Sequence, residues 1–77
     1  MTPSQADQRI MLSRRTLHRY RAMIDAGTIP SEDIALIGAE IDRLVDIARL
    51  VPDKAAKIAT LIGQWRDLLV AIRGKLN

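Results

Sequence analysis

The chain contains no cysteine and no phenylalanine, and it has few aromatic residues of any kind. Without cysteine it forms no disulfide and offers no thiolate to a metal. Tyr20 and Trp65 are the only aromatic residues, so the core is built mainly from Ile, Leu, Val and Ala. No run reaches the roughly 18 apolar residues that a membrane-spanning helix needs. The first residues lack the basic start and apolar core of a signal peptide, and we therefore expect a cytoplasmic protein without a membrane span.

Groups that support catalysis are equally scarce. His18 is the only histidine, and no carboxylate is placed nearby in the sequence to orient it. Asp42 and Asp46 share a helix face, but Arg43 and Arg49 flank them and no third ligand is evident, which favours a solvated acidic surface over a metal site. The chain carries no phosphate loop, nucleophile motif or zinc spacing. We expect a protein that is not an enzyme, with no cofactor, no metal and no small-molecule substrate.

Three stretches of the chain carry residues at alternating steps of three and four, a spacing that puts them on one face of an α-helix. We call each such row a seam. The first seam is Ala6, Ile10, Ser13, Leu17, Tyr20 and Ile24. The second is Ile34, Ile37, Ile41, Leu44, Ala48 and Val51. The third is Ala55, Ile58, Ile62, Trp65, Leu69, Ile72 and Leu76.

Helix-ending and helix-starting residues separate the seams. Gly27 suits the position just after a helix, Pro30 follows it, and Ser31 is a good N-cap for the next helix. Pro52 disfavours helix at Val51 and can open a new helix. We therefore predict helices near residues 4–26, 31–50 and 53–76, folded as an all-α antiparallel three-helix bundle in a single domain, residues 1–77. The alternative is a helical hairpin with one long arm kinked at Pro52, which dimerises.

Charge is distributed unevenly along the chain, although the whole chain carries only +3. Residues 1–30 carry a net +3, residues 31–51 a net −3, and residues 52–77 a net +3. Opposite charge on neighbouring helices favours their pairing. The pattern is therefore first of all structural.

The densest basic segment is the best functional lead. Residues 13–21 read Ser-Arg-Arg-Thr-Leu-His-Arg-Tyr-Arg, and on one helix they form a basic face suited to phosphates or acidic protein. Its candidate binding residues are Arg14, Arg15, His18, Arg19 and Arg21. The opening Ser-Arg-Arg-Thr-Leu also resembles the start of a recognition helix in helix-turn-helix proteins, over residues 12–30 only. That resemblance implies a break before Ser13, whereas the first seam predicts one continuous helix.

Apolar residues off the seams form a second lead. Leu36, Ile47 and Leu50 lie away from the second seam, and they either widen the core or form a dimer or partner face. Gly38 and Gly63 lie inside predicted helices, where glycine is costly, and we interpret them as marks of close approach between the second and third helices.

These observations favour a small binding protein, regulatory or inhibitory in role. We expect it to dock a protein partner or a second copy through apolar helix faces, in a coiled-coil-like manner, with the arginines orienting the contact. The alternative is a nucleic-acid-binding protein that places the same arginines on phosphates. Association of the basic helix with a membrane surface is a weaker third hypothesis.

Overall fold

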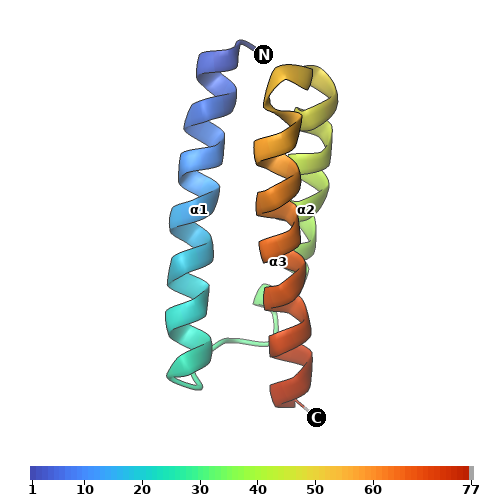
Figure 1. Cartoon of the computed structure of the whole chain (residues 1–77). Coiled ribbons are helices and arrows are strands. Elements are labelled where there is room, and N and C mark those ends of the chain that lie inside the picture. The colour runs from blue at the N-terminus through green and yellow to red at the C-terminus, as the bar shows by residue number, and fades with distance from the viewer. Residues whose placement is uncertain (77) are drawn as a thin grey trace.

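A computed structural model of the chain describes residues 1–76, with side chains through residue 75, as three helices packed side by side (Figure 1). The helices are α1 (Pro3–Asp25), α2 (Asp33–Leu50) and α3 (Ala55–Leu76), and a short 3-10 turn, η1 (Pro52–Lys54), precedes α3. Each helix runs antiparallel to the one before it, so the N-terminus lies at the same end as the turn between α2 and α3 (Figure 1). The predicted all-α antiparallel three-helix bundle is confirmed, in a rod of 39 × 18 × 17 Å.

α1 is a single unbroken helix with a strong cap at each end. Thr2 and Gln5 form a capping box, in which the Thr2 hydroxyl accepts from the Gln5 backbone and the Gln5 side chain accepts from the Thr2 backbone. At the other end Gly27 has φ +70°, and the backbone N–H groups of Gly27 and Thr28 donate to Ile24 and Met23. This is a Schellman motif. The predicted stop at Gly27 is confirmed, and the absence of a break at Ser13 excludes a helix-turn-helix within α1.

The α2 boundaries differ from the prediction at one end only. α2 begins at Asp33, and its N-cap is Glu32 without a side-chain hydrogen bond, so Ser31 is not the cap. At the other end Val51 leaves the helical region with φ −131° and ψ 78°, and Pro52 opens η1. The chain therefore turns back at this point, and the alternative of one long arm kinked at Pro52 is wrong.

The core is a continuous apolar cluster in which all six members of the first seam are buried. In α3 the buried row is Ile58, Leu61, Trp65, Leu68 and Ile72. Ile62 and Leu69, which the predicted seam placed in the core, are only half-buried. Leu76 belongs to the predicted seam, but its side chain lies outside the described residues. The buried row shares Ile58, Trp65 and Ile72 with the predicted seam and replaces Ile62 and Leu69 by Leu61 and Leu68, so the buried face of α3, which packs on both α1 and α2, is turned by about 40° from the predicted one.

One buried hydrogen bond ties α1 to α3. The Trp65 indole Nε1–H donates to Ser13 Oγ at 2.9 Å, and both side chains are almost fully buried. The Tyr20 ring packs against Trp65 edge-on, with centroids 6.0 Å apart. Burial raises the pKa of the Tyr20 phenol, and the nearby Asp33 carboxylate raises it further. The hydrogen bond from the Trp65 indole explains why a serine, Ser13, occupies a core position of α1.

The helical glycines do not have the role that their positions suggested. α2 and α3 do share the most extensive helix contact. A Cβ built on Gly38 or Gly63, however, would meet no atom within 4 Å. These glycines therefore face open space, and the close approach of α2 and α3 does not depend on them.

Candidate binding surface

The predicted basic residues gather on the outer side of α1. Arg14, Arg15, His18, Arg19 and Arg21 are all exposed, and we call this set the arginine surface. On a continuous helix, the sequence separation of two residues sets the angle between their side chains. The buried seam of α1 therefore shows in which direction each basic side chain points. Arg15 and Arg19 lie about opposite the buried seam, and Arg14, His18 and Arg21 form a row on its flank. The fold thus presents five basic positions on one rigid element.

No acidic group within residues 1–76 forms an ion pair with the arginine surface. The three ion pairs of this region join Arg9 to Glu40 at 3.6 Å, Arg43 to Glu40 at 3.8 Å, and Lys54 to Asp7 at 3.1 Å. Each pair has at least one half-buried member but remains in contact with solvent, and such pairs contribute modestly to stability. The consequence for the surface is larger, because uncompensated charges of one sign create a positive potential that attracts anionic partners.

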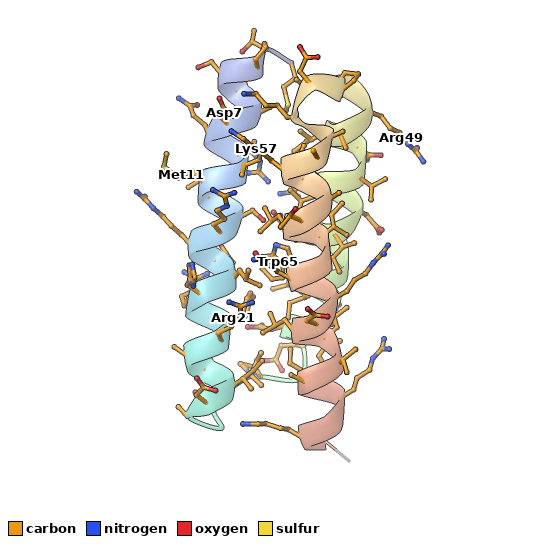
Figure 2. All side chains as sticks on the ribbon, viewed as in Figure 1. Asp7, Met11, Arg21, Arg49, Lys57 and Trp65 are labelled. Carbon is orange, nitrogen blue, oxygen red and sulfur yellow. The ribbon has the colours of Figure 1, made fainter. Side chains whose placement is uncertain are left out.

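α3 adds basic charge on the side that it shares with α1. Figure 2 shows Lys57 and Arg21 on the same α1–α3 side of the bundle. Further down this side Lys75 donates to the Ile24 carbonyl at 2.7 Å and thereby satisfies an orphan group at the end of α1. Lys57 is exposed and available to extend the arginine surface, whereas Lys75 is engaged with the end of α1. Sequence reasoning missed Lys57, because only the packing of α3 on α1 brings it to this side.

Exposed apolar side chains border the arginine surface at its N-terminal end. Met11 and Leu12 are 53% and 51% exposed, one turn before Arg14 and Arg15. Met11 points away from the bundle (Figure 2). Behind the surface, the Arg19 guanidinium lies 6.0 Å from the centroid of the Tyr20 ring, within the range of a cation–π contact. The surface therefore combines charge with a small apolar area.

The second predicted set, on α2, is not brought together. Ile47 is buried in the core and is only 3% exposed, because α2 has a neighbour on each flank and buries a wider arc than its seam. Leu36 and Leu50 are exposed, at 59% and 64%. They are fourteen residues apart, or about 21 Å along a helix axis. The predicted apolar interface is thus reduced to two separated leucines.

Within the described part of the chain, no group of three or more His, Asp or Glu side chains lies close enough together to hold a metal ion. No pocket opens between the helices in this part. His18 lies on the arginine surface, exposed to solvent. None of the described helices has an apolar stretch long enough to cross a bilayer. The candidate site is therefore an exposed helix surface.

The fold and this surface define the chain as a small three-helix bundle with one basic, unpaired helix face. No family model, no curated protein and no solved structure matches it.

Proposed function

We propose that the protein is a non-enzymatic binding protein that docks an acidic protein partner on the arginine surface of α1. The observation that carries the proposal is the exposure of all five basic positions on a helix whose other face is already used in the core. Such a helix is held rigid by packing, so binding costs little ordering of the backbone. A protein that binds without chemistry acts on its partner by occupying a surface, which is a regulatory or inhibitory role.

The composition of the surface favours a protein partner. α1 contains arginine but no lysine. Arginine and methionine are enriched at protein interfaces and lysine is depleted, and the guanidinium forms planar two-point contacts with carboxylates. Met11 and Leu12 supply apolar contact at the edge of the surface. The cytoplasmic location expected from the composition stays a prediction.

A nucleic acid is the second candidate, and Lys57 favours it. This side chain adds a flexible positive charge on the α1–α3 side, as phosphate-tracking surfaces do. Because α1 is continuous, contact with a duplex would come from phosphates along the helix and would not use helix-turn-helix geometry. Binding of this kind weakens steeply with salt.

The test is fluorescence anisotropy with labelled random-sequence DNA and RNA, and with a labelled amphipathic peptide rich in Glu and Leu, at about 50 and about 200 mM salt. The test variant replaces the four α1 arginines with glutamine: Arg14, Arg15, Arg19 and Arg21. A matched control replaces four exposed arginines on α2 and α3: Arg43, Arg49, Arg66 and Arg73. Both variants lose four positive charges, and the control leaves every residue of α1 unchanged.

We expect the peptide to bind the wild type and the control but not the test variant, with a modest dependence on salt. Nucleic-acid binding that falls by a hundredfold or more between the two salt concentrations, and that only the test variant loses, would establish the second candidate. Equal loss in both variants would mean that net charge, and not this surface, attracts the anion. Absence of binding to all three probes would overturn the proposal.

A further inference from the structure

The outer side of the α2–α3 pair carries half-buried apolar residues that no helix covers. On α2 the row is Ile34, Gly38 and Val45, and on α3 it is Ala55, Ala59, Ile62 and Leu69. We call these residues the α2–α3 surface. All are half-buried except Ala59, which is exposed.

Contacts with α1 fix where this surface lies. Glu40 on α2 pairs with Arg9 of α1, and Lys75 on α3 donates to the end of α1. The α2–α3 surface occupies the opposite flank of each helix. Arg49, which continues the α2 row one turn beyond Val45, points outward on the side away from α1 (Figure 2). The surface is therefore on the other side of the bundle from α1 and its arginines.

Charges of opposite sign border this surface on its two helices. Asp42, Asp46 and Arg49 are exposed on the α2 border, with a net charge of −1, and Arg66 and Arg73 are exposed on the α3 border, with a net charge of +2. None of these five forms an ion pair within residues 1–76. Such an arrangement is complementary to itself, because a copy that exchanges the positions of α2 and α3 places acidic residues against basic ones.

We propose that the α2–α3 surface binds a second copy of this chain, related by a two-fold axis parallel to the helices. This axis sets α2 of one protomer against α3 of the other and keeps each residue at its height along the rod. Asp42 lies nine residues before Val51 and Arg66 eleven residues after Ala55, which puts them about 14 and about 17 Å from the turn. Asp42 of one copy thus meets Arg66 of the other at nearly the same level, twice per dimer.

The area of the α2–α3 surface indicates what class of dimer to expect. α2 has 18 residues, so the surface is about 27 Å long and about 20 Å wide, near the lower end of specific interfaces. Area alone does not fix affinity, but interfaces this small are typical of weak, transient complexes, and we expect a Kd of about micromolar to tens of micromolar. Gly38, where an added Cβ would meet nothing in the monomer, leaves room for the second copy to approach.

The test is sedimentation equilibrium of the full chain from about 5 to about 500 µM, a range that brackets the expected Kd. The wild type is expected to fit a monomer–dimer equilibrium of the 8.6 kDa chain. Asp42→Arg and Arg66→Asp each place like charges together twice in the dimer, so each should weaken association by roughly tenfold. The double variant restores both opposite-charge contacts and the wild-type net charge, and it should restore association to within about threefold.

Two further pairs of variants separate this surface from general effects. Asp25→Arg changes net charge as Asp42→Arg does, but at the end of α1, and should leave association unchanged. Val45→Lys places a charge in the middle of the surface and should abolish the dimer, whereas Leu36→Lys, an exposed site on α2 away from the surface, should not. Circular dichroism checks that each variant stays helical.

A mass that remains 8.6 kDa up to the highest concentration would overturn the proposal and leave this surface to a different protein. A dimer that Leu36→Lys dissociates and Val45→Lys does not would assign the interface to another side of the bundle. Failure of the double charge exchange to restore association would overturn the two-fold arrangement. None of these outcomes depends on the anion probes, so this inference fails or stands separately from the proposed function.

Discussion

The hydrogen bond between Trp65 and Ser13 gives the sharpest test of what holds α1 in register with α3. Replacing Ser13 with alanine leaves the indole N–H in the core without an acceptor, which costs about 1–3 kcal/mol. Alanine is the better helix former and recovers about 0.5 kcal/mol. We therefore expect the free energy of unfolding to fall by about 0.5–2.5 kcal/mol and the Tm to fall by about 2–20 °C in a domain of this size.

Removing the hydrogen-bond donor, Trp65, has a different consequence for Ser13. Trp65→Phe destabilises the core because it removes buried volume and leaves a space. The Ser13 hydroxyl, however, can then donate to the backbone carbonyl of Arg9 one turn earlier. In the Trp65→Phe background, Ser13→Ala should consequently be neutral or slightly stabilising. The two substitutions are thus coupled by about 1–3 kcal/mol, more than distant sites show.

Urea unfolding followed by helical circular dichroism measures all four members of this cycle, since two of them lack the only tryptophan. Thr16→Ala is the matched control, because the Thr16 hydroxyl donates to the Leu12 carbonyl at 3.0 Å on the same helix without a tertiary partner. Its effect should stay within about 0.5 kcal/mol. If Ser13→Ala has the same effect with Trp65 as with phenylalanine, the hydrogen bond contributes nothing to stability.

Two further predictions concern the backbone and the titration of Tyr20. Gly38→Ala should stabilise the chain by about 0.5–1 kcal/mol, because alanine has the higher helix propensity and its Cβ meets no other atom. Gly27→Ala should destabilise the chain by about 1–2 kcal/mol, because Gly27 has φ +70°. Thermal melts of the two variants test this difference. The pKa of Tyr20 lies above 10.0, chiefly through burial, so the folded state holds the phenolic proton more tightly than the unfolded state. The stabilisation that the raised pKa of Tyr20 provides is fully present below pH 10 and is lost as pH rises through the folded-state pKa. Tyr20→Phe should abolish this loss when the free energy of unfolding is measured from about pH 8 to 11.

The sequence was enough to predict the α1 core and not enough to predict that of α3, for a physical reason. Most residues between the seam positions of α1 are polar, with Met11, Leu12, Ala22 and Met23 as the exceptions, so one face is clearly the more apolar. In α3, Leu61 beside Ile62 and Leu68 beside Leu69 offer two adjacent seams, and both fit the helical period. Which one is buried depends on where α1 and α2 sit around α3, and periodicity along one helix does not contain that information.

The same reasoning explains how well the candidate sites were predicted. The exposure of the arginine surface follows from the α1 seam, because residues opposite a buried stripe face solvent. Ile47 failed as a surface residue because α2 lies against α1 as well as α3, so its buried arc is wider than its seam. The α2–α3 surface was not predicted because its members come from two helices, and Ile62 and Leu69 were assigned to the core. A surface shared between helices needs the packing before it can be seen.

The two proposed surfaces lie on different sides of the bundle, and this placement has a consequence for binding. A two-fold dimer through the α2–α3 surface carries its two arginine surfaces on the outside, one on each copy and facing away from each other. A compact acidic partner can therefore contact only one of them, and binding should saturate at one partner per protomer without avidity. A long polyanion that wraps around the dimer could contact both, which raises its apparent affinity through effective concentration. Comparing the stoichiometry of a short and a long anionic probe therefore tests both surfaces at once.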